Sequence, residues 1–154
     1  MLRFLQIFFV FFAFFYASLA YATNPTITGI SVNGANSQLT VTFSEDVFNA
    51  TGGSGNLEAT DFVLSISGGA ATIGAATPTS ISRTSDSIWV LGFNTSGTAN
   101  GSETIQVVPA SSSSIYDGSD NAASATQSNN TASLTEKVLP TIASTTVNLS
   151  LIHI

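Results

Sequence analysis

Hydrophobic and polar residues alternate in several short segments of this chain, a period typical of strands with one buried face. The clearest case is residues 39–48, LTVTFSEDVF, where an alternating run leads directly into the carboxylates Glu45 and Asp46. If the alternation continued, Glu45 would lie on the buried face, and a buried carboxylate needs a partner. We therefore expect an unusual arrangement at this strand end.

Similar runs, separated by turn residues, recur along the rest of the chain, and none of them shows a convincing helical period. The predicted strands cover residues 27–32, 38–44, 62–66, 71–73, 80–83, 87–93, 103–108 and 131–136. The segment 87–93 is apolar on both faces, which predicts a central position in its sheet. Short strands at this spacing predict an all-β sandwich of about seven to eight strands.

The inward-facing positions of these strands predict a core between two sheets. This predicted core consists of Leu39, Val41, Phe43, Phe62, Leu64, Ile66, Trp89, Leu91, Phe93, Ile105 and Val107. Trp89 is placed in the core because it lies in the most apolar strand.

The first 22 residues have a different character from the rest. An almost wholly apolar stretch, residues 4–19, follows Arg3 and leads into the small-residue site Ala20-Tyr21-Ala22. This pattern indicates a secretory signal peptide at residues 1–22, cut after Ala22. A retained membrane anchor is the alternative, since the apolar stretch is nearly long enough to span a bilayer. Cleavage predicts a secreted or cell-surface protein that begins at Thr23 and has no further membrane contact.

A short motif repeats 115 residues apart. Pro140-Thr141-Ile142 matches Pro25-Thr26-Ile27, and the same offset pairs Val147 with Val32 and Asn148 with Asn33. We interpret residues 23–139 as one repeat and 140–148 as the truncated start of a second, so that neighbouring repeats in the same chain are expected partners. A chance match in a threonine-rich tail is the alternative. The last residues, 149–154, resemble translated adapter sequence and are interpreted as a non-native tail.

The charge and cysteine content of the chain make some classes of function less favourable. The whole chain has a formal net charge of −6, and loss of Arg3 with the signal peptide leaves two basic residues against nine acids, a net charge of −7. Such a surface disfavours nucleic acid and anionic lipid and can attract divalent cations. The chain has no cysteine, so disulfides do not stabilise it even in an oxidising compartment.

Several short motifs occur in an order typical of one family. They are FSEDVF at 43–48, LEATDFVL at 57–64, Gly-x-Glu-Thr at 101–104 and IYDGSDNAA at 115–123. Together they resemble a bacterial immunoglobulin-like tandem repeat of the kind found in S-layer proteins and large repetitive surface adhesins. The resemblance covers residues 24–136 and implies a β-sandwich that acts as a spacer or binding module without catalytic activity. Asp120 stands where the family usually has glycine.

Chemistry for catalysis is sparse. The single histidine lies in the suspect tail and there is no cysteine, so the usual nucleophile–base pairs and His/Cys zinc sites are not expected. Two carboxylates can hydrolyse glycosides, and Glu45 with Asp117 is the pair to test. A carbohydrate-binding module is a further alternative, with Tyr116 and Phe48 as candidates for stacking on a sugar or contacting a surface ligand.

A calcium site is the one cofactor that the sequence suggests. Carboxylates and an amide lie at predicted strand ends and turns, where a sandwich collects them at its poles: Glu45, Asp46, Asp61, Asp117, Asp120 and Asn121. Calcium takes six to eight oxygen ligands of these kinds. The alternative is that Asp117 and Asn121 only hydrogen-bond within their own turn. We expect a non-enzymatic spacer or adhesive repeat, with calcium at one pole as an additional hypothesis.

Overall fold

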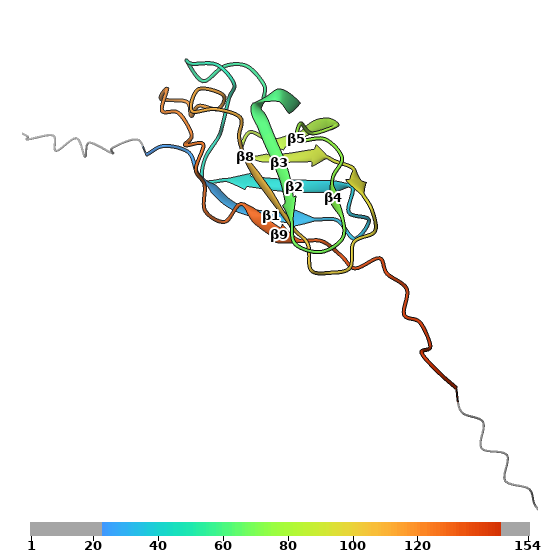
Figure 1. Cartoon of the computed structure of the whole chain (residues 1–154). Coiled ribbons are helices and arrows are strands. Elements are labelled where there is room, and N and C mark those ends of the chain that lie inside the picture. The colour runs from blue at the N-terminus through green and yellow to red at the C-terminus, as the bar shows by residue number, and fades with distance from the viewer. Residues whose placement is uncertain (1–22, 146–154) are drawn as a thin grey trace, which may run out of the picture.

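The structure is a computed structural model that describes residues 23–145 (Figure 1). The predicted signal peptide, the end of the second-copy segment and the predicted tail lie outside the described residues. Within 23–145 there is no helix long and apolar enough to cross a membrane.

The regular secondary structure of the described residues is almost all β, as the alternation predicts. Its nine strands are β1 (Ile27–Val32), β2 (Gln38–Phe43), β3 (Phe62–Ser67), β4 (Thr72–Ile73), β5 (Ser80–Ser85), β6 (Ile88–Gly92), β7 (Thr95–Ser96), β8 (Thr104–Pro109) and β9 (Thr131–Ser133). A 3-10 turn, η1 (Ala59–Asp61), precedes β3. β4 and β7 have only two residues each, and β7 lies in a segment predicted to be loop.

The strands form antiparallel sheets that pack as a sandwich (Figure 1). The first sheet has the order β1-β2-β6-β5 and the second the order β3-β8-β9, while β4 and β7 form a small separate ribbon. β6 lies between β2 and β5, which confirms the central position predicted for the most apolar segment.

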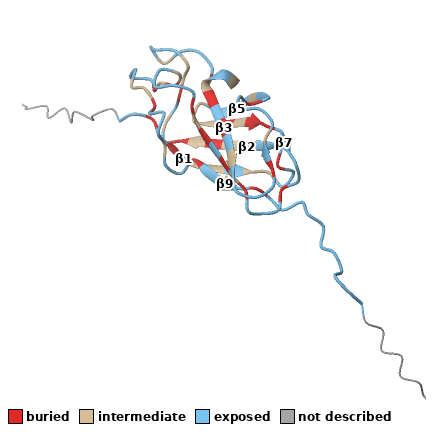
Figure 2. Ribbon diagram, viewed as in Figure 1, coloured by how far each residue is buried: buried red, intermediate tan, exposed pale blue. Residues whose placement is uncertain are grey.

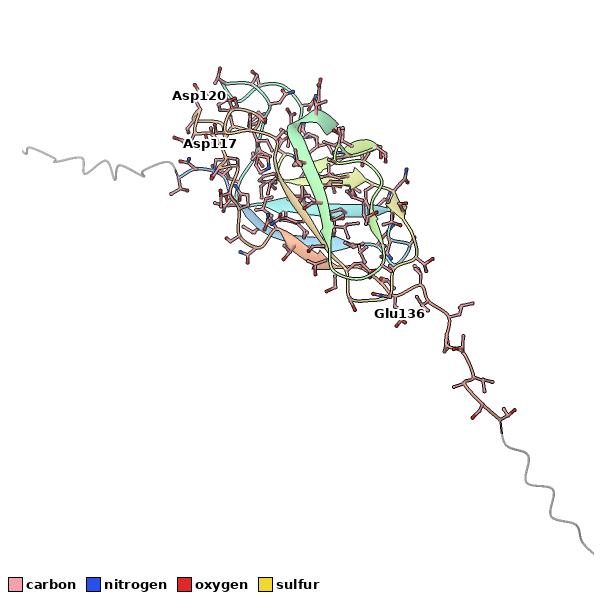
Figure 3. The ribbon with its side chains drawn as sticks, in the orientation of Figure 1. Asp117, Asp120 and Glu136 are labelled. Atoms are coloured by element: carbon pink, nitrogen blue, oxygen red, sulfur yellow. The ribbon has the colours of Figure 1, made fainter. Side chains whose placement is uncertain are left out.

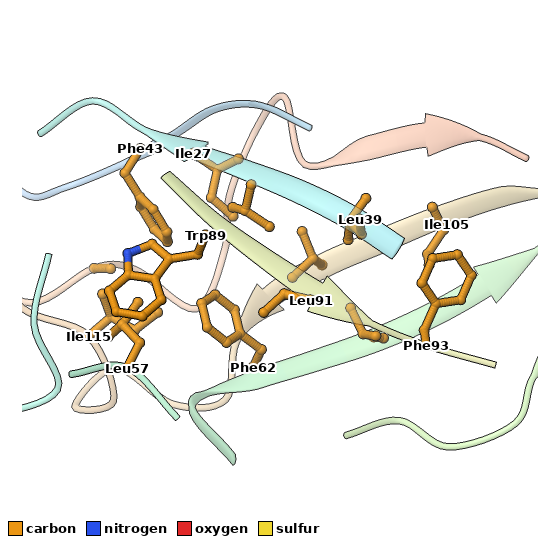
Figure 4. Packing of buried hydrophobic residues seen from close by; sticks show 14 of the residues in the cluster. Ile27, Leu39, Phe43, Leu57, Phe62, Trp89, Leu91, Phe93, Ile105 and Ile115 are labelled. Atoms are coloured by element: carbon orange, nitrogen blue, oxygen red, sulfur yellow. The ribbon is translucent and has the colours of Figure 1, made fainter. Parts of the chain in front are cut away.

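The core lies between the two larger sheets and matches the predicted set. Ten of the eleven predicted residues are buried, and Ile66 is half-buried against them. Phe43 and Phe62 meet across the sheets with ring centroids 6.4 Å apart. Figure 4 shows Trp89 and Leu91 packed among these rings, and Figure 2 shows the buried residues along the facing strands. The period of two therefore identified the inward face correctly.

The expected inward position of Glu45 is wrong. β2 ends at Phe43, the chain bends at Ser44, and Glu45 is half-buried beside this bend. Val47 takes the buried position instead, and its N–H donates to the carbonyl of Asp86 at 3.0 Å. The alternation stops because the backbone leaves the ladder, so the phase no longer determines which side chain faces inward.

The described part of the chain enters and leaves the sandwich at opposite poles (Figure 1). At the entry pole, formed by residues 44–55 and 115–123, the Asn24 side chain donates to the Ala122 carbonyl. At the exit pole, formed by residues 33–37, 97–103 and 134–137, the Lys137 N–H donates to the Ala99 carbonyl at 2.8 Å. The chain therefore crosses the length of the domain between its entry and its exit.

Truncation of the core should be costly. Phe43→Ala removes a buried ring that contacts the opposite sheet, and we expect a loss of about 3–5 kcal/mol in the free energy of unfolding. Val63→Ala, at a side chain 39% exposed in β3, is the matched control and should change stability by less than about 0.5 kcal/mol. Urea denaturation measures both. An unchanged Phe43→Ala variant would show that the two sheets do not pack through this ring.

Candidate functional site

The first feature of the candidate calcium ligands is their place in the fold. Figure 3 shows Asp117 and Asp120 at this pole and Glu136 at the opposite one. Asp61 precedes β3, whose first residue pairs with Pro109 at the same end. The pole that carries Asp117 and Asp120 is the one where the chain enters, whereas Pro140 follows the exit pole.

Asp117 is buried, and both of its carboxylate oxygens are occupied by its own turn. Oδ1 accepts from the N–H groups of Ser119 and Asn121, each at 2.8 Å, and Oδ2 accepts from the Asn121 side chain at 2.7 Å. Burial raises the pKa of the Asp117 carboxyl, but the bonds from Asn121 and Ser119 outweigh burial and leave the pKa below its usual value. The local alternative, an Asx turn, is the arrangement that the structure contains.

The carboxylates of Asp120 and Asp61 also accept backbone hydrogen bonds. Asp120 has a left-handed backbone, φ 69°, and its Oδ1 accepts from the N–H of Gly52 in the neighbouring loop. Asp61 Oδ2 accepts from the N–H of Glu58 at 2.7 Å, which closes the η1 turn. Burial raises the pKa of Asp61, and its hydrogen bonds only partly offset this.

Glu45 lies close enough to Asp117 for the two charges to interact. Burial, followed by the charges of Asp117 and Asp46, raises the pKa of the Glu45 carboxyl above its usual value. A raised pKa is useful for a general acid. Asp117, its partner in the alternative of glycoside hydrolysis, is however held by Ser119 and Asn121. Glycoside hydrolysis stays an untested alternative to the expected non-enzymatic role.

Within residues 23–145, no three acidic or histidine side chains lie close enough together to hold a metal ion. The structure instead gives the carboxylates of Asp61, Asp117 and Asp120 separate hydrogen-bond partners. Calcium binding stays a prediction, and it would require the entry-pole loops to rearrange.

The aromatic candidates for a surface ligand are partly covered. Phe48 and Tyr116 are both half-buried and pair through a backbone bridge, with the Phe48 N–H donating to the Tyr116 carbonyl at 2.8 Å. Trp89 is buried in the core, as expected. The described part of the chain forms no pocket beside them, and binding of a glycan or protein at this pole stays a prediction.

The exit pole contains a buried carboxylate that the sequence reasoning missed. Glu103 lies directly before β8 and has no exposed surface. Its Oε1 accepts from the N–H groups of Ala70 and Ala71 at 2.7 and 2.9 Å. Asn100 donates to both oxygens, and Gly101 donates to Oε2 at 3.0 Å. In the sequence, Glu103 has the same inward-facing phase as Ile105 and Val107, and this alternation was the signal that could have predicted its burial.

These bonds keep the carboxylate charged. The bond from Ala71 has the largest effect on the pKa, and together with the bonds from Asn100 and Ala70 it overcomes burial and lowers the pKa from 4.5 to about 2. The turn around it needs glycine: Gly69 has a φ of 56°, and a Cβ at this position would overlap the Glu103 carboxyl. The carboxylate therefore holds two turns, 68–71 and 99–101, in one conformation.

The same pole fixes the departing chain. The Leu134 N–H donates to the Glu103 carbonyl at 3.0 Å. Asn36 is buried and pairs with the backbone of Thr135 like a neighbouring strand: its Oδ1 accepts from the N–H at 2.8 Å, and its Nδ2 donates to the carbonyl at 2.6 Å. With the bond between Lys137 and Ala99, three of the four residues from 134 to 137 have a backbone group held by the domain.

Comparison of this chain with known protein families, curated proteins and solved structures finds no match.

Loss of the Asp117 carboxylate should destabilise the entry pole without any metal being involved. Asp117→Ala leaves the N–H groups of Ser119 and Asn121 without their acceptor, which we expect to cost about 1–3 kcal/mol in the free energy of unfolding. Glu136→Ala, at an exposed position of the opposite pole, is the control. Both variants and the parent are melted with calcium and with chelator, and each pair of curves should coincide. A calcium-dependent stabilisation that Asp117→Ala abolishes would instead establish the predicted site.

Acid should weaken the domain through Glu103. Because the folded pKa is about 2 and the ordinary value is 4.5, this carboxylate stabilises the fold fully above pH 4.5 and progressively less as the pH falls toward 2. Glu103→Gln should lower stability at neutral pH and flatten the dependence between those limits. Urea denaturation from pH 2 to pH 7 measures this, with Glu136→Gln, an exposed carboxylate at the same pole, as control. Identical pH profiles for Glu103→Gln and the parent would disprove the role.

Proposed function

We propose that this domain is a non-enzymatic, immunoglobulin-like repeat of an exported multidomain surface protein. It would extend, space or present an adhesive part of that protein, with neighbouring repeats as its main partners. The signal-peptide pattern at residues 1–22 and the net negative charge of the mature chain support export and a surface location.

The strand order supports the immunoglobulin-like assignment. If β4 and β7 are set aside, the sheets β1-β2-β6-β5 and β3-β8-β9 correspond to the A-B-E-D and C-F-G sheets of a constant-type immunoglobulin domain. The buried Trp89 lies in the strand equivalent to E. The motifs at 43–48, 101–104 and 115–123 support the same family.

One observation carries the repeat proposal: the same motif is buried in its first occurrence and exposed in its second. Ile27 is 1% exposed at the start of β1, and Pro25 is buried beside it. Their counterparts are Ile142, 82% exposed, and Pro140, also exposed. A residue pattern that forms a core strand in one place and lacks a core in the other fits the first strand of a further domain.

The position of the ends fits a linear array. The chain enters at one pole and leaves at the other, and its backbone is held as far as Lys137. Only Val138 and Leu139 then separate this domain from the residue equivalent to Pro25. Both are exposed and apolar, at 48% and 81%, and a following domain would cover them. Successive repeats would therefore lie close together, with a short connection.

Matched substitutions test the repeat. In the chain itself, Ile27→Ala should cost about 2–5 kcal/mol because it removes buried core. Ile142→Ala should change stability by less than about 0.5 kcal/mol because the side chain is exposed. In a designed tandem, where a second copy of the domain begins with its Pro25 at position 140, Ile142→Ala should become as costly as Ile27→Ala. Calorimetry of the two-domain protein measures this.

Two outcomes would contradict the proposal. One is a second copy that fails to fold in this register, since the motif would then not be a domain start. The other is an intact coding sequence without further β-sandwich repeats past Asn148. Determining that sequence is the most direct single observation.

A further inference from the structure

The first and last strands of the domain run side by side in the same direction. β1 and β9 pack against each other (Figure 1), yet β1 forms its ladder with β2, and β9 forms its ladder with β8. Two side-chain bridges fix their relative direction: Ile27 is tied to Gln127, and Asn36 is tied to Thr135. Both residue numbers increase from the first bridge to the second, so the two segments are parallel.

Side-chain amides provide the bridges that a backbone ladder does not. At the entry end, Gln127 Oε1 accepts from the Ile27 N–H at 2.8 Å. At the exit end, Asn36 makes two bonds to the Thr135 backbone, and the Lys137 ammonium donates to the Gly34 carbonyl. Asn36 can turn its amide toward Thr135 because its backbone is left-handed, with a φ of 56°. The bridges lie near the two ends of the paired segments.

This geometry determines how the domain would respond to tension applied through its ends. A pull at residue 23 draws β1 toward the entry pole, and a pull beyond Lys137 draws the β9 segment toward the exit pole. The force then acts along both strands in opposite directions. Bonds loaded in this way share the force and must break together, whereas strands pulled apart at one end lose their bonds one at a time. Unfolding under force is governed by this barrier.

We infer that the domain is a force-bearing module, in which the amide bridges of Gln127 and Asn36 form a shear clamp between the first and last strands. The inference rests on the proposed function for its purpose, because a tandem surface array transmits tension from end to end through every repeat. The clamp itself belongs to a single domain.

The test is single-molecule force spectroscopy with two attachment geometries. The chain has no cysteine, so a pair of introduced cysteines defines where handles attach. Thr23→Cys with Leu139→Cys loads the clamp in shear. Thr23→Cys with Asp46→Cys pulls the entry-pole ends of β1 and β2 apart and opens their ladder from Ile27 and Phe43. At the same force, unfolding should be at least about tenfold slower in the first geometry, because several hydrogen bonds must break together.

Variants test whether the amide bridges cause the resistance to unfolding under shear. Asn36→Gly removes the two exit-end bonds to Thr135 and retains a residue suited to the left-handed backbone. Asn129→Gly, at an exposed residue with a φ of 55°, is the matched control. Under shear, Asn36→Gly should unfold about fivefold faster or more, the rate equivalent of at least one net hydrogen bond. Under unzipping its rate should match the parent, because the exit pole is not loaded first. Gln127→Ala removes the entry-end bridge and provides a second variant if Asn36→Gly does not fold.

The outcomes distinguish a shear clamp from a general stabilising effect, and both from the proposed function. Equal unfolding rates in the two geometries would overturn the inference. So would an Asn36→Gly or Gln127→Ala variant that is unchanged in shear, or an Asn36→Gly variant accelerated equally in both geometries, which would make the bridge a general stabiliser. Because the measurement uses one domain, it is independent of whether further repeats follow. An intact gene without repeats would remove the array and leave the clamp in place.

Discussion

The exit half of this domain depends on one constraint: a carboxylate with no exposed surface must find donors within the fold. Glu103 meets it with the N–H groups of four residues in two separate turns. An unpaired buried charge would be prohibitively costly, so these turns cannot separate while Glu103 is ionised. The glycine at position 69 is required because the carboxyl occupies the space of a side chain.

The residues around this carboxylate also hold the last residues of the domain in place. The backbone carbonyl of Glu103 accepts a hydrogen bond from the Leu134 N–H. In the turn that Glu103 fixes, the carbonyl of Ala99 accepts from the Lys137 N–H. Asn36 adds two further bonds to the chain between them. The departing segment is thus held by the fold rather than by its own secondary structure, since β9 ends at Ser133. A connecting element with this property has a defined direction where it leaves the domain.

The polar residues of this domain form local and long-range hydrogen bonds. The entry pole contains both kinds, since Gln127 bonds to Ile27 and Asp120 bonds to Gly52, 100 and 68 residues away. At the entry pole, Asp117 and Asp61 satisfy donors within four residues in the sequence, so each stabilises its own turn. At the exit pole, Glu103 and Asn36 bind partners as far as 33 and 99 residues away. Local bonds stabilise a loop, whereas distant ones join strands. For a module placed between neighbours, the second kind determines how load and orientation pass through the domain.

The sequence by itself determined the class of fold, the inward faces and most strand positions. Alternation depends only on neighbouring residues, so Leu39, Val41 and Trp89 could be assigned to the core without any knowledge of topology. The same reasoning placed Asp117 and Asp120 in one turn. It also allowed the local alternative for Asp117, because an Asx turn is closed by residues close in sequence.

Only the tertiary structure decided which of two glutamates, Glu45 or Glu103, is buried. Glu45 and Glu103 share the inward phase of their strands, and the sequence pointed to Glu45. The chain bends after Phe43, which leaves Glu45 half-buried, whereas Glu103 meets backbone donors from a turn more than thirty residues away. The pairing of Asn36 with Thr135 was likewise decided only by the tertiary structure. Periodicity reports which side of a strand a residue faces, but a buried polar group is stable only where distant segments supply its partners, and their position is a property of the folded chain.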